Sequence, residues 1–375
     1  MVAVFGATGS LGRDVCARLA RSRVPYVVVG RDRARLDRLA ASLAHDAIPA
    51  TVTVADIADP IAVRSAVADC RVLVNCAPAD VAGLPLIRAA LDAGMHYVDA
   101  AGEQGHIRHA FDTFSEASTR RRIVIVPALG FDYAVGDCLA SLAARGHHEL
   151  VEIVVAYAIG GADVSGNSAR AAASSRGGQE VVYRNGRWTP VPFEMDRHVF
   201  EFPPPIGRRQ MSRYGSGEVV TVPRHLKTRR VTTLITTTSL APHAAWLPVF
   251  PVLRPLLGWI RTTPARAVLG LAANLAVRLG RGPAAPTESH TSDHNDRWFS
   301  VVAEARTTMG TVGRAVATGG NFHEVTAAIL AQGAVWLFRG TDRCGVHSPA
   351  TAFDAATLLD SLTPDGVRWT HVEPV

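Results

Sequence analysis

Lysine is almost absent from this chain, since Lys227 is its only lysine among 39 basic residues. The arginines that replace it are scattered, without a long basic block and without interleaved aromatic residues. The formal charge is +6 and the pI about 9.4, but this scattered pattern does not predict nucleic-acid binding. The positive charge suits a small anionic ligand instead.

Cysteine is also scarce and carries no disulfide or metal pattern. The five cysteines, an odd number without a CxxC pair, are Cys16, Cys70, Cys76, Cys138 and Cys344. The fourteen histidines form no HExxH motif, and the cluster His290, Asp293 and His294 is better explained as a polar surface loop than as a zinc site. We therefore predict no metal, and reduced thiols in a cytoplasmic protein.

A clean apolar run of membrane-spanning length is missing too. Residues 240–279 are unusually apolar, but prolines and arginines interrupt them and leave no run of about twenty apolar residues. Three interpretations stay open for this segment: a lid over an acyl-chain pocket, core or homodimer-interface helices, and a peripheral membrane anchor. No signal sequence precedes the first apolar run, so we expect a cytoplasmic protein, with peripheral membrane contact as the alternative.

The clearest pattern that is present occupies the first thirty-one residues. An apolar run at 2–5 enters a glycine loop, a helix-like stretch follows at 14–21, and a second apolar run covers 26–29. A strand, glycine loop, helix and strand in this order are typical of a dinucleotide-binding unit. Cofactor contacts are predicted for the G-x-x-G-x-x-G loop, through Gly6, Thr8, Gly9, Ser10, Leu11 and Gly12.

The end of the second strand indicates which dinucleotide binds. Gly30 occupies the turn and Arg31 follows it, where an NAD site would usually carry an acidic residue for the ribose 2′-hydroxyl. A guanidinium can hold a 2′-phosphate through two parallel hydrogen bonds. Asp32 is explained as the N-cap of a helix over 33–43. The predicted cofactor is therefore NADPH.

Strands and helices continue to alternate up to about residue 129, at the predicted end of the first domain. Further strands are predicted at 51–56, 72–77, 96–99 and 122–127. Ligands of open α/β sheets collect at the carboxyl ends of the strands. There we place Asp56 and Ile57 near the adenine, and Asn75, Cys76 and Ala77 near the nicotinamide ribose. The pattern predicts an α/β fold, a Rossmann-type doubly wound parallel sheet.

A second domain is expected because 375 residues exceed one ordinary domain. Over 130–344 the alternation breaks down, and strands are predicted at 151–159, 180–183, 219–222 and 230–238. This pattern predicts an α+β substrate and catalytic domain with a mainly antiparallel sheet. Residues 345–375 are predicted to return to the first domain.

Several short motifs resemble those of the saccharopine dehydrogenase-like reductases. Besides the glycine loop and Gly30-Arg31, they are Asn75-Cys76-Ala77, residues 94–99, Gly102-Glu103, residues 130–133 with Asp137, residues 165–168 and residues 345–350. The nearest branch is the one that contains the trans-acting enoyl reductases, which reduce a C=C bond of polyketide-type acyl chains with NADPH. Tyr133, where Ser is usual, and Asn167, where Gly is usual, depart from the family pattern.

This resemblance implies an NADPH-dependent reductase of secondary metabolism that transfers hydride to the C=C bond of a hydrophobic or carrier-tethered acyl substrate. Tyr133, Asp132 and His96 are the candidate catalytic residues. Substrate contacts are predicted for Tyr97, Glu103, Phe131, Ser165 and Asn167. Reduction of a C=N bond stays open, since Arg170, Arg176, Arg208 and Arg209 could bind carboxylates. A non-catalytic, lipid-associated scaffold that binds the nucleotide stays open too.

Overall fold

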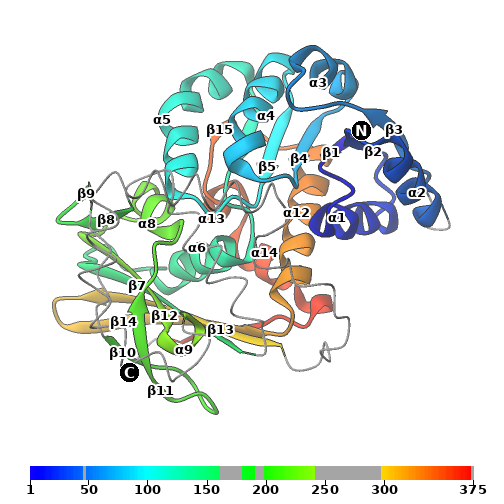
Figure 1. Ribbon diagram of the computed structural model, residues 1–375. Helices are drawn as coiled ribbons and strands as arrows, with labels where there is room; N and C mark the ends of the chain where they lie inside the picture. Colours follow the sequence, from blue (N-terminus) through cyan, green and yellow to red (C-terminus); the bar gives the residue numbers. More distant parts are fainter. Residues whose placement is uncertain (45–47, 161–179, 191–197, 241–296, 373–375) are drawn as a thin grey trace, which may run out of the picture.

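A computed structural model describes residues 1–44, 48–160, 180–190, 198–240 and 297–372, which form two sheets with helices between and around them (Figure 1). Among the predicted site residues, Ser165 and Asn167 lie outside the described ranges, and so does nearly all of the apolar segment 240–279.

The first sheet is entirely parallel and has the strand order β15-β6-β5-β4-β1-β2-β3. Its strands are β1 (Val2–Phe5), β2 (Tyr26–Gly30), β3 (Thr51–Val54), β4 (Val72–Asn75), β5 (His96–Asp99), β6 (Val124–Val126) and β15 (Gly345–Val346). The central strands are continuous apolar runs because both faces are buried. The chain passes from β1 to β2 on one side and reaches β4 on the other, so the topological switch point lies at β1.

Helices cover both faces of this sheet, which confirms the predicted doubly wound α/β fold. One face packs α1 (Ser10–Arg21), α2 (Arg33–Leu43) and α12 (Phe322–Arg339), and the other packs α3 (Pro60–Val67), α4 (Ala79–Ala93) and α5 (Gln104–Arg121). Helix α12 belongs to this layer although it comes late in the sequence, because it lies against α1, β4 and β5.

The second sheet is mixed and mostly antiparallel, as predicted, with the order β10-β11-β12-β7-β13-β14-β16 and β8 and β9 attached beside β12. Its strands are β7 (Glu152–Gly160), β8 (Val181–Arg184), β9 (Arg187–Pro190), β10 (His198–Glu201), β11 (Arg208–Arg213), β12 (Arg230–Thr236), β13 (Trp298–Thr307), β14 (Gly310–Gly319) and β16 (Arg368–Val372). Helix α6 (Phe131–Ala143) packs on the inner face, between the two sheets (Figure 1).

Short helices complete the described chain and correct one predicted strand. They are α8 (Glu218–Thr221), η1 (Val222–Arg224), α9 (Thr237–Leu240), α13 (Pro349–Ala352), α14 (Ala355–Asp360) and η4 (Thr363–Asp365). The apolar run 219–222 is helical rather than extended. Pro223 lacks the N–H that a central strand needs, and its fixed φ suits the first turn of a helix.

The predicted domain division is wrong in two places. The tail does not return as a whole to the first sheet: β15 pairs with β6, but β16 pairs with β14 in the second sheet. Helix α12 lies inside the predicted substrate domain, yet it packs on the first sheet. Strand β16 pairs with the free edge of β14, and α12 covers the face of the first sheet beside α1.

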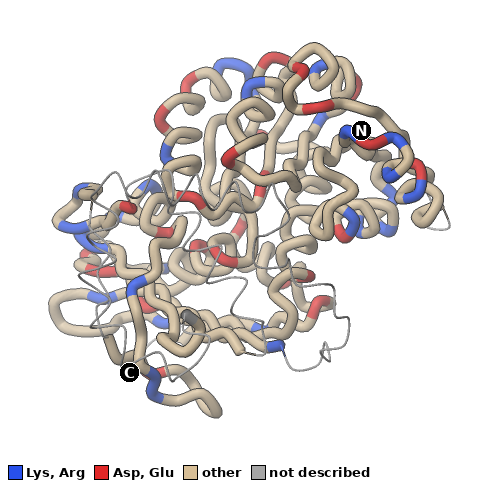
Figure 2. The backbone as a smooth tube through the Cα atoms, viewed as in Figure 1, with Lys and Arg blue, Asp and Glu red and all other residues tan. Residues whose placement is uncertain are grey.

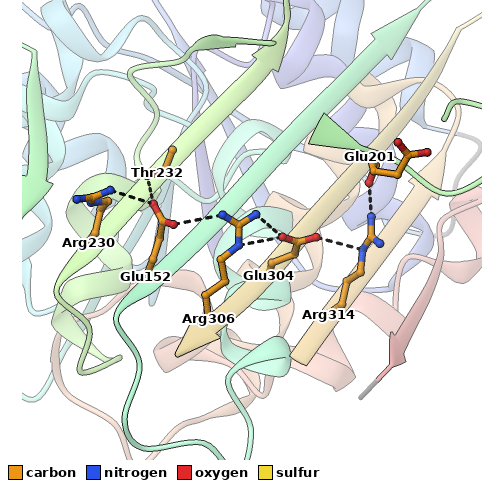
Figure 3. Close-up of polar contacts among 7 residues, drawn as sticks. All are labelled: Glu152, Glu201, Arg230, Thr232, Glu304, Arg306 and Arg314. Carbon is orange, nitrogen blue, oxygen red and sulfur yellow. Dashed lines mark hydrogen bonds and ion pairs between the residues drawn. The ribbon is translucent and has the colours of Figure 1, made fainter. Parts of the chain in front are cut away.

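Acidic and basic residues are interspersed along the described chain (Figure 2), and on the second sheet they form an ordered row. Arg306 contacts Glu152 at 3.3 Å and Glu304 at 2.6 Å, and Arg314 lies 3.6 Å from Glu304. Figure 3 shows these side chains alternating in sign across neighbouring strands. They point to the side that also buries Val154, away from α6. Such partly exposed pairs stabilise the sheet only modestly.

Candidate functional site

The glycine loop forms a tight turn between β1 and α1. Gly6 has φ +77°, and a Cβ there would lie 2.9 Å from the main-chain nitrogen of Ala77. A Cβ on Gly12 would lie 2.4 Å from the Gly6 carbonyl oxygen. Only glycine fits either position: Gly6 lets the loop approach the end of β4, and Gly12 lets α1 pack closely against the loop.

The first turn of α1 is open to an anion. Gly9 occupies the N-cap position and no side chain caps the helix, which leaves the N–H groups of Ser10, Leu11 and Gly12 without intrahelical acceptors. The helix dipole favours negative charge at this end. The Ser10 hydroxyl lies 3.1 Å from Nε2 of His323 on α12, a neighbour that the sequence analysis had not assigned to the cofactor.

Arginines gather beside the same loop, where α1 and α2 meet. Arg13, Arg35 and Arg38 line a surface pocket of about 280 Å³ together with Thr8. The side chains of Arg13 and Arg35 donate to the Thr8 carbonyl oxygen at 3.1 Å and 3.4 Å. The basic segments of these two helices lie close together in Figure 2. This pocket fits a 2′-phosphate, and Arg13 and Arg38 were missed because neither directly follows β2.

The residues that follow β2 and β3 form turns at the carboxyl edge of the sheet. Arg31 is exposed, and Asp32 caps α2 by accepting a hydrogen bond from the Arg35 N–H at 3.0 Å, as predicted. At the end of β3, Asp56 accepts from the Ala58 N–H at 3.0 Å, and Ile57 is half-buried against the apolar core beside it. These residues lie at the carboxyl edge, on the β2–β3 side of the switch point.

A buried aspartate organises the carboxyl ends of β4, β5 and β6. Asp99 accepts hydrogen bonds from the Ala101 and Ala128 N–H groups at 2.9 Å and 3.1 Å, and from the Tyr97 hydroxyl at 2.8 Å. His106 Nε2 lies 2.8 Å away. Burial opposes the charge, but the His106 imidazole and these donors together hold the pKa of Asp99 below its usual range. Asp99 therefore fixes the loops that would surround the nicotinamide.

Asn75, Cys76 and Ala77 follow β4 next to this hub. The Asn75 side chain accepts from the Ala77 N–H at 2.9 Å and donates to the Tyr97 hydroxyl at 3.2 Å. Burial raises the pKa of the Cys76 thiol to about 12, so it is a neutral thiol. Glu103 Oε2 accepts from the Gly102 N–H at 3.1 Å, directly before α5.

Three predicted site residues belong to the core instead. His96 is at the amino end of β5, at the opposite edge of the sheet from the carboxyl ends. Its Nδ1 accepts from the Val124 N–H at 2.9 Å, and burial, aided by Arg71, lowers its pKa to about 4. Tyr97 is fully buried, and its hydroxyl donates to Asp99 and accepts from the Asn75 side chain. Phe131 is fully buried too, with its ring 4.4 Å from that of Phe299.

The first turn of α6 carries the two remaining catalytic candidates. Tyr133 has its hydroxyl 3.5 Å from that of Tyr214 and against Gly102, where a Cβ would lie 2.4 Å from it. The Asp132 side chain makes no hydrogen bond within the described residues, and burial raises its pKa to about 6. The structure thus brings Asp132 and Tyr133 together with Tyr214, at the junction of the two sheets.

Behind this turn lies a second carboxyl group that the sequence analysis missed. Glu218, in α8, is fully buried, and burial raises its pKa to about 8. It contacts the hydroxyl of Tyr157, which also lies 2.7 Å from the Asp132 carbonyl oxygen. The only sequence signal was an acidic residue directly before an apolar run, which is equally typical of a surface turn.

The fold and the glycine loop together define a two-domain dinucleotide-binding protein. Residues 2–124 match the sequence profile of the saccharopine dehydrogenase NADP binding domain. These residues therefore form an NADP-binding domain of the saccharopine dehydrogenase type, which confirms NADPH as the cofactor. The residues present fit it, through the open turn of α1 and the arginine pocket.

Individual relatives agree with this assignment. The human saccharopine dehydrogenase-like oxidoreductase is 29% identical over 149 residues, 36% of this chain and 35% of that protein. A lipid droplet localized protein of Caenorhabditis elegans is 26% identical over 156 residues, 39% of this chain and 37% of its own. The chain thus matches little more than a third of the length of these relatives.

The whole described architecture has a counterpart among solved structures. Saccharopine dehydrogenase (L-Glu forming) from Saccharomyces cerevisiae, in its apo form, superposes with a TM-score of 0.62 over 99% of both chains at 12% identity. At that identity the likeness establishes the fold alone. Within the described ranges, no helix combines the length and apolarity needed to cross a bilayer.

Proposed function

We propose that this chain is an NADPH-dependent oxidoreductase of the saccharopine dehydrogenase-like type, with its substrate bound between the carboxyl edge of the parallel sheet and the first turn of α6. The observation that carries the proposal is the position of Asp132, Tyr133 and Tyr214. They come from the second domain, yet the Tyr133 hydroxyl packs against Gly102, in the loop that follows β5. Sites between domains commonly bind small substrates.

NADPH supplies a hydride when it is bound. The chain must then stabilise negative charge on the substrate and deliver a proton. The hydroxyls of Tyr133 and Tyr214, 3.5 Å apart, can donate to a developing oxyanion. Asp132, with its pKa raised by burial to about 6, is the candidate acid that returns a proton to the substrate carbon.

For the substrate, we propose a hydrophobic or carrier-tethered acyl group with a C=C bond conjugated to a carbonyl, as in an enoyl reductase of secondary metabolism. The imine alternative requires arginines that bind carboxylates. Arg208 and Arg209 are exposed on β11, where Arg208 stands opposite Glu201, and Arg170 and Arg176 lie outside the described residues.

The experiment is a fluorescence titration with NADPH and NADH of wild type, Arg31→Ala and Arg35→Ala. Hydrogen bonds to a charged group contribute about 1.5–3 kcal/mol, so we expect each variant to bind NADPH about ten- to a hundredfold more weakly and NADH unchanged. Arg21→Ala is the matched control, because Arg21 lies in the last turn of α1 and donates to the Ala17 carbonyl oxygen. Equal binding of both nucleotides by all forms would contradict the arginine pocket.

NADPH oxidation is then followed with a trans-2-enoyl thioester, its saturated analogue and a cyclic imine. We expect oxidation with the unsaturated thioester alone. Oxidation with the imine alone would favour the C=N alternative. If NADPH binds and no substrate oxidises it, the scaffold hypothesis predicts that the protein sediments with phospholipid vesicles, and that removal of residues 240–279 abolishes this. Peripheral membrane contact in an otherwise cytoplasmic protein is proposed on the same basis.

A further inference from the structure

The hydroxyl of Tyr157 contacts two oxygen atoms that could each accept its proton. Its oxygen lies 2.7 Å from the main-chain oxygen of Asp132 and in hydrogen-bond contact with Oε1 of Glu218. A phenol carries one proton, and a peptide carbonyl oxygen can only accept. If Tyr157 donates to Asp132, the proton between Tyr157 and Glu218 must come from the carboxyl group.

We infer that Glu218 is held as a neutral carboxylic acid that donates its proton to the Tyr157 oxygen, and so acts as a positioning residue for the first turn of α6. Tyr157 in turn donates to the carbonyl of Asp132. That turn carries Asp132 and Tyr133, so the consequence for catalysis rests on the proposed function. The protonation state itself does not.

The surroundings of Glu218 favour the neutral form. Asp132, Tyr133 and Asp137 face it from α6, Tyr157 from β7, and Tyr214 and Ser216 from the turn before α8. Within the described chain no basic side chain pairs with it. Nearby Arg224 contacts Asp112 at 3.0 Å, and His225 contacts Asp137 at 2.9 Å. A buried carboxylate without a counter-charge is costly, so such groups keep their proton.

The packing is closed around the pair. Glu218 is fully buried, and a Cβ on Gly136 of α6 would lie 2.0 Å from Glu218 Oε1 and 2.4 Å from the Tyr157 hydroxyl. From α5, the uncharged Gln104 side chain donates to the Ser216 carbonyl oxygen at 2.9 Å and fixes the turn before α8. The carboxyl group therefore has no room to turn toward solvent.

The test compares Glu218→Gln with Glu152→Gln across pH. An amide retains a donor for the Tyr157 oxygen and needs no proton on folding, so Glu218→Gln should unfold at the wild-type midpoint or a higher one at pH 7. Glu152 pairs with Arg306 at 3.3 Å on the partly exposed face of the second sheet, so Glu152→Gln should change that midpoint only slightly and is the control for the pH dependence. A folded pKa above the unfolded one makes stability decline as pH rises. The wild-type decline between about pH 4.5 and pH 8 should flatten in Glu218→Gln alone.

Infrared spectroscopy gives a direct readout. At pH 7 the wild type should show the band of a protonated carboxyl group, and Glu218→Gln should lack it. Loss of this band in Tyr157→Phe above pH 7 would support the inference, because removal of the phenol oxygen removes the acceptor. The inference is overturned if Glu218→Gln unfolds earlier than both the wild type and Glu152→Gln at pH 7, or if the infrared spectra of the wild type and Glu218→Gln are identical. NADPH oxidation is measured separately, so the protonation state of Glu218 can be determined even if the proposed activity is absent.

Discussion

Four carboxyl groups lie within or against the junction of the two sheets. Two of them have an imidazole partner within the described chain, and two do not. Asp99 and Asp137 are fully buried, and each contacts an imidazole, with His106 and His225 at 2.8 Å and 2.9 Å. Asp132 and Glu218 have no such partner among the described residues. Burial disfavours charge in all of them, yet the pKa is lowered in the first pair and raised in the second.

The contrast separates carboxylates that join elements through their charge from carboxyl groups whose raised pKa lets them carry a proton near neutral pH. Asp137 accepts from Thr221 at 2.7 Å, from His225 at 2.9 Å and from the Ala350 N–H at 2.9 Å. It therefore joins α6 to the α8–η1 segment and to α13, as Asp99 joins three strand ends. Asp132 and Glu218 hold nothing together through charge. Asp99 and Asp137 hold elements together through charge, Glu218 positions α6 as a neutral acid, and Asp132 remains the candidate for proton transfer.

Replacing a paired carboxylate should have the largest effect on stability. Asp137→Ala leaves an imidazole, a hydroxyl and an N–H buried without their acceptor, and breaking a buried pair in this way costs about 3–5 kcal/mol. Urea unfolding would measure the loss. Asp354→Ala is the matched control, since Asp354 caps the exposed start of α14 by accepting from the Thr357 N–H, and loss of a cap costs about 1 kcal/mol. Equal losses would mean that Asp137 is not a hub.

Crowding the unpaired region should have the next largest effect. Gly136→Ala places a Cβ where Glu218 and Tyr157 meet, and overpacking of a closed core costs about 1–3 kcal/mol. Gly105→Ala is the control, because a Cβ on that helical glycine meets nothing within 4 Å. Alanine is favoured over glycine in helices by about 1 kcal/mol, so the control should unfold at the same or higher urea concentration. A stabilised Gly136→Ala would contradict the packing described here.

The parallel sheet could be predicted from sequence because its signals are local. A glycine loop between two apolar runs fixes β1, α1 and β2, and burial of both faces makes each later strand a readable apolar run. The arrangement of α12 and β16 could not be predicted, because each packs on an element far away in the sequence. Their sequence patterns predict a helix and a strand, but they do not indicate which element each one packs against.

The candidate site divides along the same line. Gly6, Gly12 and Asp32 have roles that neighbouring residues dictate, so their predicted geometry agrees with the structure. The structure places His96 and Tyr97 in the core: His96 begins the predicted strand 96–99 and so lies at its amino end, and the buried face on which Tyr97 lies depends on the helices that cover the sheet. Glu218 and Tyr214 were missed because they approach α6 only through the tertiary fold.

A pH titration sharpens the contrast further, with an effect of about 1.5–3 kcal/mol expected for a hydrogen bond to a charged group. The pKa of Asp99 is lowered, so its contribution is present above the unfolded value and is lost as pH falls through the folded one. Asp99 raises the pKa of His106 against the opposing effect of burial. The His106 contribution is therefore present below its unfolded pKa and lost as pH rises through the folded one.

In His106→Gln, both the loss of stability at acid pH and the loss of stability as pH rises should become smaller, and chemical unfolding at about pH 2.5, 4, 6 and 8 would measure this change. His109→Gln, on the same helix, is the control. His109 lies with its ring 5.9 Å from that of Phe114, and no described carboxylate forms an ion pair with it. A pH dependence that is unchanged in His106→Gln would show that the Asp99–His106 pair does not carry charge in the folded protein.

Asp132→Asn should cause the smallest loss of stability. The carboxyl group has no described hydrogen bond to lose, and its pKa is raised by burial to about 6. A raised pKa means that its contribution declines as pH rises from the unfolded value, about 3.9, toward 6. An amide of the same shape stays neutral at every pH, so Asp132→Asn should match the wild type below the unfolded value, lack that decline, and be at least as stable as the wild type at pH 7. A loss as large as that of Asp137→Ala would place Asp132 with the structural carboxylates. A fall in NADPH oxidation with unchanged unfolding would instead locate its role in proton transfer, because the fold does not depend on its charge.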